Sequence, residues 1–564
     1  MKSVTFLLFL LLLVRAAHGQ TGTDGATAAD WPHYGGTQLS WRYSALDQIN
    51  SLNIKQLAPA WVFQTGDYSE NLQATPIVVD GVMYIITPRA WVFALNAGTG
   101  QVLWQYKYPQ PRPGRSGSQA TFTENRGVAV GDGKVLFGTN DNYMVALDRK
   151  TGREAWKVSV DDPKQCGCNI TSAPLVVKDK VIVGGSGGDG AHRGYLTAFY
   201  MKTGRLAWRF YVIPGPGEKG HETWKGNSWK FGGGAPWMTG SYDPELNLVY
   251  WGTGNAAGNF FDGDRVEGSK SSDRGVNLYT ASVVSLDADT GKLRWHYQEI
   301  PDDLWDFDSA YEVVLLDRMV KGRMRKLLVH MNKSGLTFVL DRVTGEFVGV
   351  FSVPEVQTWI SGVTETGKLV GRREPRLGET RNFCPSAAGA KSWNSMAYSP
   401  RTGFIYVPAN ELCDDITANS REPQEGRFYT NGSYSIKLPP NRTTYSHLDA
   451  WDPLTGKRAW SYPYKYVLLA SVLATAGDLV FTGNPEGEFF ALDARTGTRM
   501  WSFQTGAGNR GSSISYSVKD RQFIATSTGW QQSIIGSQTA MVFPDQTWRA
   551  GSTLIAFALP NGPK

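Results

Sequence analysis

Residues 302–310, which read DDLWDFDSA, place four carboxylates in one short segment that also carries Leu304, Trp305 and Phe307. Carboxylates held close together repel one another and resist ionisation unless a positive charge compensates them. An acidic loop in solvent has little use for large aromatic side chains. The segment therefore predicts that a positively charged partner is bound beside the four acids, Asp302, Asp303, Asp306 and Asp308.

The other residue types that support chemistry show no comparable pattern. His192, His221 and His447 have no paired ligand spacing, so we interpret them as structural or surface residues. The chain holds no C-x-x-C-H motif, which excludes covalently attached haem. Cys166 and Cys168, in KQCGC, could form a bond that closes a very small ring, or remain as thiols.

An eleven-residue pattern, roughly A-L-D-x-x-T-G-x-x-x-W, recurs seven times along the chain. Its copies start at residues 94, 146, 198, 285, 339, 450 and 491. We interpret each copy as a strand that ends at the Asp, a turn through Thr-Gly in which Gly takes a positive φ, and a second strand that carries its Trp to a buried interface. The copy at 339 lacks the Trp.

Most copies follow another strand and tight turn, as in PIVVDGVMYIIT at 76–87. Together these strands predict a four-stranded antiparallel unit, the blade of a β-propeller, and hence an all-β chain. The copy spacing widens from 198 to 285 and from 339 to 450, which indicates long insertions or, in the second case, a blade with a decayed motif. Counting such a blade, or one closed by TLIAFALP (553–560) against an N-terminal strand, favours an eight-bladed propeller over seven blades.

The N-terminus, MKSVTFLLFLLLLVRAAHGQ, is typical of a secretory signal, with Lys2, an apolar run and small residues before the expected cleavage site. We therefore expect a signal peptide at residues 1–19, a single domain at 20–564, and a secreted or periplasmic protein without stable membrane insertion. Loss of Lys2 and Arg15 lowers the net charge from +6 to +4, with no basic block, so nucleic acid is not an expected partner.

Several motifs together resemble the quinoprotein alcohol dehydrogenases. They are NRGVAV, RGYLTAF, YDPELNLVYWGTGN, LWDFD and FCPSAAGAKSWNSMAYSP, and the resemblance runs from about Trp31 to Ala558. It implies an eight-bladed propeller, with tryptophan-docking repeats, that binds pyrroloquinoline quinone (PQQ) and one metal ion on its central axis.

The resemblance also implies which residues bind the quinone. Trp237 matches the tryptophan on which the ring stacks, and Arg126 and Lys333 match two cationic contacts. Thr171 and Ser186 match two hydroxyl contacts. Ser392 stands where an Asn usually contacts the cofactor, with Trp393 beside it.

The metal ligands implied by the resemblance are Asp189, Asn255 and Asp306, whose oxygens suit Ca²⁺ or a trivalent lanthanide. Asp308 matches an extra Asp of lanthanide-using relatives, so we expect a lanthanide first. Asp306 is the expected general base, taking the hydroxyl proton of the alcohol while hydride passes to the quinone C5 and the metal polarises the C5 carbonyl. We interpret Asp302 and Asp303 as loop acids that make turn hydrogen bonds.

Some positions depart from the family pattern. Asp189 stands where most members have Glu, and Ala120-Thr121 replaces an adjacent cysteine pair above the quinone. Cys384 and Cys413 match a family disulfide, and an oxidising compartment agrees with it.

The resulting hypothesis is a PQQ- and metal-dependent enzyme that oxidises alcohols, polyols or sugars and passes electrons to an external acceptor, a cytochrome c type protein. The first alternative is a non-catalytic propeller, a scaffold or binding protein that retains the repeat. A sugar lyase or hydrolase is a second alternative, but the sequence shows no acid and base pair for it. Oligomeric state does not follow from the sequence.

Overall fold

The structure is a computed structural model that describes residues 29–109, 124–263, 265, 275–531, 539–540 and 542–560. The predicted signal peptide and the Ala120-Thr121 pair lie outside these residues. Within them the helical elements are short: α1 (Pro163–Cys166) and the 3-10 turns η2 (Ile54–Gln56), η4 (His221–Thr223) and η5 (Ser228–Phe231). No helix in this part of the chain is both long and apolar enough to cross a membrane.

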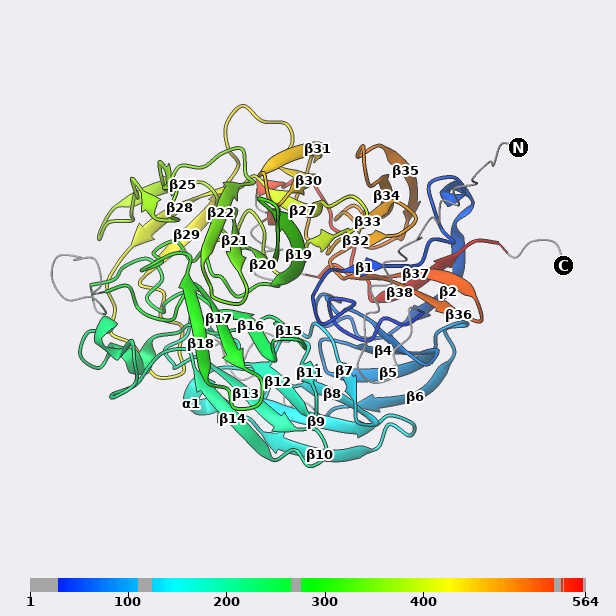
Figure 1. Cartoon of the computed structure of the whole chain (residues 1–564), viewed down its shortest axis with the longest axis horizontal. Coiled ribbons are helices and arrows are strands. Elements are labelled where there is room, and N and C mark those ends of the chain that lie inside the picture. Colours follow the sequence, from blue (N-terminus) through cyan, green and yellow to red (C-terminus); the bar gives the residue numbers. More distant parts are fainter. Residues whose placement is uncertain are drawn as a thin grey trace, which may run out of the picture.

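Strands build the architecture, and in the first half of the chain they form four sheets of four antiparallel strands each (Figure 1). The first two sheets contain β3 (Ile77–Val79), β4 (Val82–Ile86), β5 (Trp91–Asn96), β6 (Val102–Lys107), β7 (Ala129–Gly131), β8 (Lys134–Gly138), β9 (Tyr143–Asp148) and β10 (Glu154–Ser159). The next two contain β11 (Leu175–Val177), β12 (Lys180–Gly184), β13 (Tyr195–Tyr200), β14 (Leu206–Tyr211), β15 (Ser241–Asp243), β16 (Leu248–Gly252), β17 (Ser282–Asp287) and β18 (Leu293–Gln298).

Four more sheets of this kind follow in the second half. Two contain β19 (Val314–Val320), β20 (Arg323–Met331), β21 (Leu336–Asp341), β22 (Phe347–Ser352), and β26 (Ala397–Tyr398), β27 (Ile405–Asn410), β30 (Ser446–Asp452), β31 (Lys457–Tyr464). The other two contain β32 (Leu473–Thr475), β33 (Leu479–Gly483), β34 (Glu488–Asp493), β35 (Arg499–Gln504), joined by β1 (Tyr43–Ser44), and β36 (Ser513–Val518), β37 (Arg521–Thr528), β38 (Thr553–Ala558), β2 (Ala58–Gln64).

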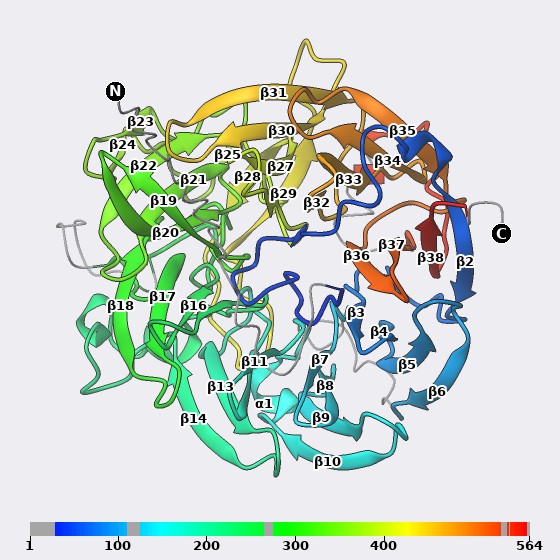
Figure 2. The ribbon, with the colours of Figure 1, turned by 45° about the vertical axis from the view of Figure 1, so that its right-hand side comes forward.

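The last of these sheets joins the two ends of the chain. β38 pairs antiparallel with β2, and Ala556 lies opposite Trp61, just as Ala94 lies opposite Trp104 inside one repeat. The TLIAFALP segment therefore closes a sheet with an N-terminal strand, which was one of the two alternatives predicted from the sequence. In the described part of the chain the sheets lie side by side round a centre, an all-β, propeller-like fold (Figure 2).

The long interval before the repeat at 450 is an insertion. It contains the two-stranded sheet of β23 (Gly362–Val363) and β24 (Leu369–Val370), and a three-stranded sheet of β25 (Thr380–Phe383), β28 (Cys413–Ala418) and β29 (Gly432–Lys437). A disulfide joins Cys384 to Cys413, as the family resemblance implied, and ties the end of β25 to the start of β28. The alternative of a decayed blade at this place is therefore wrong.

The residues that recur in each copy of the repeat contact one another between neighbouring sheets. The Asp148 carboxylate accepts the Thr151 backbone N–H (2.8 Å), and Gly152 completes the turn at φ +71°. A Cβ atom on Gly152 would lie only 2.6 Å from the Trp104 ring, whose Nε1 donates to the Arg149 carbonyl (3.0 Å). The same tryptophan-to-carbonyl bond recurs from Trp61 to Ala97, Trp156 to Met201, Trp208 to Ala288, Trp295 to Arg342, and Trp460 to Ala494.

The N-terminal segment crosses the middle of the ring (Figure 2). It is fixed by Arg42, which is buried and donates to the backbone carbonyls of Tyr34, Val472 and Ser513. Burying a guanidinium is tolerable because its donors are satisfied. Tyr34 is buried in one hydrophobic cluster with Trp393, which lines the site described below.

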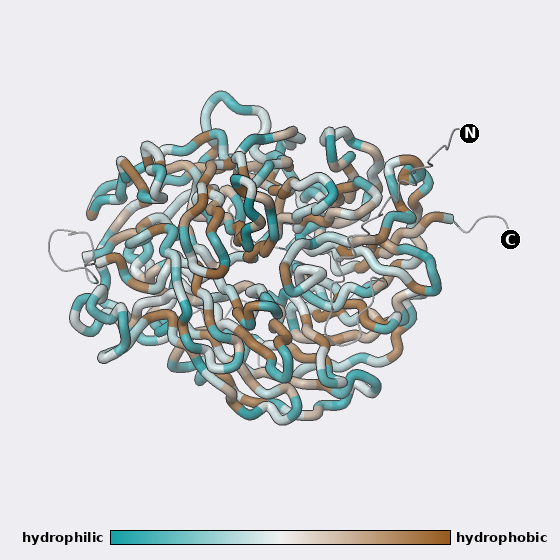
Figure 3. The backbone as a smooth tube through the Cα atoms, in the orientation of Figure 1, coloured by the Kyte–Doolittle hydropathy of each residue, from teal (hydrophilic) through white to brown (hydrophobic). Residues whose placement is uncertain are grey.

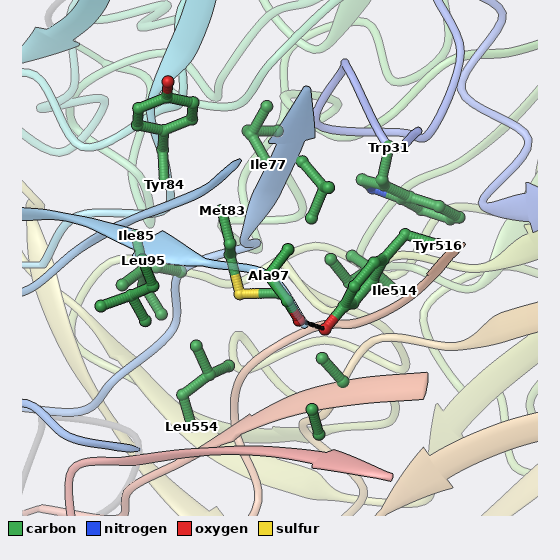
Figure 4. Close-up of a cluster of buried hydrophobic side chains, with 14 of the residues drawn as sticks. Trp31, Ile77, Met83, Tyr84, Ile85, Leu95, Ala97, Ile514, Tyr516 and Leu554 are labelled. Atoms are coloured by element: carbon green, nitrogen blue, oxygen red, sulfur yellow. Dashed lines mark hydrogen bonds between the residues drawn. The ribbon is translucent and has the colours of Figure 1, made fainter. Parts of the chain in front are cut away.

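The hydrophobic core is divided among the sheets. Hydrophobic stretches occur all round the molecule in Figure 3 rather than in one central mass. Figure 4 shows one cluster, in which Trp31 of the N-terminal segment, Ile77 of the first sheet and Leu554 of the closing sheet lie together. The Tyr516 hydroxyl donates to the Ala97 carbonyl there (2.8 Å), so the closing sheet is also tied to the first by a polar contact.

Candidate active site

A cavity of about 180 Å³ collects the predicted cofactor and metal residues. Its lining includes Arg126, Thr171, Ser186, Asp189, Trp237, Asn255, Asp306, Asp308, Lys333, Ser392 and Trp393. The lining also includes residues that the sequence did not single out: Glu124, Gly187, Gly188, Ala387, Tyr434 and Arg510. Side chains separated by up to several hundred residues thus face one space.

The topology of the sheets explains this convergence. In each sheet the first two strands are antiparallel, so the segment before the first strand and the segment after the second lie at the same end. Thr171 precedes β11 and Ser186 follows β12, Trp237 precedes β15 and Asn255 follows β16, and Asp306 precedes β19 and Lys333 follows β20. Because the sheets stand in a ring, these ends meet over its centre.

At the acidic end of the cavity, Asp306 and Asp308 both contact Lys333. Lys333 Nζ lies 3.1 Å from Asp306 Oδ1 and 3.0 Å from Asp308 Oδ2. Burial alone would lower the pKa of Lys333, but the Asp306 and Asp308 carboxylates outweigh it and hold the pKa well above its usual value. Burial raises the pKa of Asp306 well above its usual range, against the opposing charge of Lys333.

Asp308 is fixed from two further directions. Its Oδ1 accepts the Asn255 backbone N–H (2.8 Å), and its Oδ2 accepts the Trp237 indole N–H (3.3 Å). The indole N–H of Trp237, the residue on which the ring is predicted to stack, is therefore hydrogen-bonded to the acidic end of the cavity. Tyr311 packs edge-on against Trp237, with ring centroids 5.3 Å apart, and holds the indole from another side.

Asp189 and Asn255 complete the acidic end. Asp189 Oδ1 accepts from Asn259 Nδ2 (2.6 Å) and Asn255 Nδ2 (3.4 Å), and burial raises the pKa of Asp189. Asn255 Oδ1 is buried and accepts no hydrogen bond. A Cβ atom on Gly188 would lie 2.8 Å from this oxygen, so a larger residue there would press on the Asn255 side chain. A buried acceptor without a donor is uncommon in folded proteins, and this one belongs to a residue of the cavity lining, where it is available to a bound cation.

Of the other two acids of the DDLWDFDSA segment, Asp303 makes the predicted turn hydrogen bonds, whereas Asp302 forms an ion pair instead. Asp303 accepts the backbone N–H groups of Trp305 (3.0 Å), Phe307 (2.8 Å) and Asp308 (3.1 Å). Asp302 pairs with the buried Arg265 (3.2 Å). Trp305 and Phe307 are fully buried and stack with an interplanar angle of 12°, so the aromatic residues anchor the loop while its acids face inward.

Arg126 forms the basic end of the cavity. It is 3% exposed, its Nη2 lies 3.6 Å from Glu124, and burial lowers its pKa. Its Nε and Nη1 make no hydrogen bond, and its guanidinium lies over the rings of Trp237 (5.1 Å) and Trp393 (5.8 Å). A buried guanidinium with unused donors suits a carboxylate ligand, which it can bind with two parallel hydrogen bonds.

The two hydroxyl residues predicted to contact the quinone are hydrogen-bonded within the protein. Ser186 Oγ hydrogen-bonds Asn169 Oδ1, and Thr171 Oγ1 donates to the Trp237 carbonyl (3.4 Å).

Cys166 and Cys168 are joined by a disulfide, which decides between the two alternatives left by the sequence. Its small ring lies next to the segment that carries Thr171.

Sequence reasoning missed Glu124, Tyr434 and Arg510 as cavity residues. Tyr434 belongs to β29 of the insertion, for which the repeat provides no register. Arg510 precedes β36, the same position relative to a first strand that Arg126, Thr171 and Trp237 occupy. The sequence could therefore have predicted Arg510 as a cavity residue from its position before a first strand.

The site fits a hard metal ion together with an organic acid. Three carboxylates line this end, the buried Asp306 and Asp308 and the partly buried Asp189, against one ammonium, Lys333, so this end carries an excess of negative charge. In the described part of the chain no three His, Cys, Asp or Glu side chains form a metal cluster by themselves. A cation bound here therefore also needs neutral oxygen donors such as Asn255 Oδ1.

Residues 31–368 and 352–524 match the family model described as PQQ glucose/ethanol/alcohol dehydrogenase, β-propeller domain. The chain belongs to this PQQ dehydrogenase family.

Relatives within the PQQ dehydrogenase family match nearly the whole chain. The quinohemoprotein alcohol dehydrogenase of Comamonas testosteroni is 36% identical over 529 residues, which cover 90% of this chain and 73% of the relative. The lanthanide-dependent methanol dehydrogenase of Methylorubrum extorquens is 35% identical over 570 residues, 92% of each chain. The solved structure of a europium-containing methanol dehydrogenase superposes with a TM-score of 0.87 at 31% identity, covering 94% of this chain and 98% of that one.

Proposed function

We propose that this protein is a PQQ- and metal-dependent dehydrogenase that oxidises alcohols, polyols or sugars. The observation that supports the proposal most directly is the polarity of the cavity. One end holds a buried arginine with unused donors, the other holds three carboxylates and an unpaired amide oxygen, and Trp237 lies between them. PQQ is a flat ring that bears carboxylates and chelates a cation, so it matches both ends.

In this proposal Trp237 is the floor on which the ring stacks. Arg126 and Lys333 supply cationic contacts, and Thr171, Ser186, Ser392 and Trp393 supply the remaining contacts to the quinone. Asp189, Asn255 and Asp306 hold the metal ion, with Asp308 as a further donor. When bound, PQQ with its metal ion supplies the two-electron acceptor and the Lewis acid that alcohol oxidation requires.

Asp306 is the residue of this chain that removes the hydroxyl proton. Its carboxylate lines the cavity, and burial makes it a better proton acceptor than an exposed Asp. Lys333, 3.1 Å away, keeps the carboxylate oriented and compensates its charge before the proton arrives. Trp305 and Phe307 are buried and anchor the 302–310 loop, which holds the carboxylate in place.

Asp308 favours a lanthanide over Ca²⁺ in this proposal. It adds a third carboxylate beside the two from Asp189 and Asp306, and a trivalent ion gains more from each additional negative charge. Such an ion competes with the Lys333 ammonium for the same two carboxylates, Asp306 and Asp308.

The proposal extends to the whole molecule. We infer that the seven four-stranded sheets and the one five-stranded sheet of the described residues are the eight blades of one propeller domain over residues 20–564, held together by docking of the repeat tryptophans. Residues 1–19 would direct the chain to a secreted or periplasmic location, where an external cytochrome c type protein accepts the electrons.

The test is reconstitution of the purified protein. PQQ is added with CaCl₂ or with LaCl₃, and reduction of a redox dye is followed with a panel of alcohols, polyols and sugars. Turnover that requires both PQQ and a metal supports the proposal. Absence of turnover with every combination, together with absence of quinone binding, would instead support the non-catalytic propeller.

A further inference from the structure

Arg510 is a second buried arginine at the basic end of the cavity. Arg510 is 1% exposed, and its guanidinium carbon lies 4.7 Å from the ring centroid of Trp393 and 4.9 Å from that of Trp530. Two aromatic rings thus hold the guanidinium while its residue lines the cavity.

The backbone on either side of Arg510 is anchored. The Asn509 N–H donates to the Asn484 carbonyl (3.0 Å), and the Ser471 N–H donates to the Gly511 carbonyl (3.2 Å). Ser512 Oγ also hydrogen-bonds Ser471 Oγ (3.1 Å). The loop before β36 therefore presents the arginine from a fixed base, which lowers the entropic cost of binding a ligand.

The two arginines at this end repel each other. Arg126 and Arg510 share the ring of Trp393, at 5.8 and 4.7 Å. Burial and the neighbouring charge of Arg126 lower the pKa of Arg510 to about 10, while Glu124 and Glu70 act in the opposite direction. Glu124 lies 3.6 Å from Arg126 Nη2, but its side chain is 20% exposed. Holding two buried cations together is costly unless an anion binds between them.

We propose that Arg510 acts with Arg126 as a two-arginine clamp for carboxylates of the quinone. The proposal rests on the proposed function, since it names a further residue for the same cofactor. The Lys333 end of the cavity is already occupied by carboxylates of the protein, so a polycarboxylate ligand is oriented with its acid groups toward Arg126 and Arg510.

A purely structural role is the competing explanation. Arg510 could support Trp393 by stacking alone, without meeting the ligand's charge. The two roles differ in one measurable respect. A support for Trp393 affects every flat ligand equally, whereas a carboxylate clamp distinguishes PQQ from its uncharged trimethyl ester.

The experiment measures equilibrium binding of PQQ and of PQQ trimethyl ester to the cofactor-free protein at fixed CaCl₂, by quenching of tryptophan fluorescence. The proteins are wild type, Arg510→Gln, Arg510→Lys and the control Arg193→Gln. Arg193 is matched because its guanidinium also lies over two rings, Tyr211 (4.0 Å) and Trp229 (5.2 Å), but it does not line the cavity. Circular dichroism and the thermal midpoint establish that each variant is folded.

The clamp predicts that Arg510→Gln binds PQQ about ten- to a hundredfold more weakly and the ester nearly as well as wild type does. Arg510→Lys should recover part of the affinity for PQQ, and Arg193→Gln should leave both constants unchanged. Equal weakening of acid and ester, or no change in either, would overturn the clamp. If the wild-type protein binds neither ligand, the proposed function itself fails.

Discussion

His447 provides a stability prediction that does not depend on the cofactor. It lies in β30, and its ring is held between two acids: Nε2 lies 3.0 Å from Glu411 Oε1 and Nδ1 lies 2.9 Å from Asp449 Oδ1. Arg458 (3.5 Å) also faces Asp449, and Glu411 accepts the Glu355 backbone N–H (2.7 Å). The cluster connects β30 and β31 with the segment that leaves β22.

The contribution of His447 to the free energy of unfolding follows from the charges around its ring. Burial alone would lower the pKa of His447, but Asp449 and Glu411 outweigh it and raise the pKa to about 9, against 6.5 in an unfolded chain. This difference corresponds to about 3 kcal/mol of stabilisation. Because the folded pKa is the higher one, the contribution is fully present below pH 6.5 and is lost as the pH rises through about 9.

The perturbation is His447→Gln, which cannot titrate. The free energy of unfolding is measured by denaturant titration with tryptophan fluorescence from about pH 6 to about pH 10. The advantage of wild type over the variant should shrink by about 3 kcal/mol across this range. The control is His296→Gln, because burial lowers the pKa of His296 to about 4, so above about pH 7.5 the ring is neutral in both states and the advantage of wild type should stay constant there. An unchanged advantage of wild type over His447→Gln at both pH limits would refute the reasoning.

Three further predictions concern the site and the repeat. Asp306→Asn should bind PQQ as wild type does but turn over at least about a hundredfold more slowly, and near-wild-type rates would remove Asp306 as the base. Asp308→Ala should reduce lanthanide-supported dye reduction more than calcium-supported reduction, whereas an equal loss would argue against the lanthanide preference. Gly152→Ala should lower the unfolding free energy more than Gly133→Ala. Both glycines have a positive φ (+71° and +67°), and a Cβ on Gly152 would meet Trp104 while one on Gly133 meets nothing within 4 Å. Equal losses for the two glycine variants would show that the tryptophan contact contributes little.

The repeat predicted most of the fold because it encodes local structure and packing together. The turn around Asp148, Thr151 and Gly152 is set by side-chain hydrogen bonds and a positive φ, and Trp104 then fixes the next sheet. The strand that closes the ring was harder to assign, since Trp61 and Ala556 of one sheet lie at opposite ends of the chain.

The candidate site was predictable only where family motifs covered it. Trp237, Asn255 and Asp306 lie in such motifs, and the structure brings them to one cavity. Tyr434 was missed because its place in the cavity lining depends on how the insertion folds, whereas Arg510 was missed although it precedes a first strand, as Arg126 and Trp237 do. The contact of Lys333 with both Asp306 and Asp308 is likewise a tertiary fact that spacing cannot supply.

The central claim is that oxygens from separate sheets surround one cation beside a ring stacked on Trp237. Crystals of the protein grown with PQQ and a lanthanide would test it, because anomalous scattering locates the ion without reference to any prior assignment. The account predicts one strong anomalous peak within about 2.6 Å of oxygens from Asp189, Asn255 and Asp306, with flat density over the Trp237 indole. A peak away from these three residues, or a quinone bound outside the cavity, would contradict it.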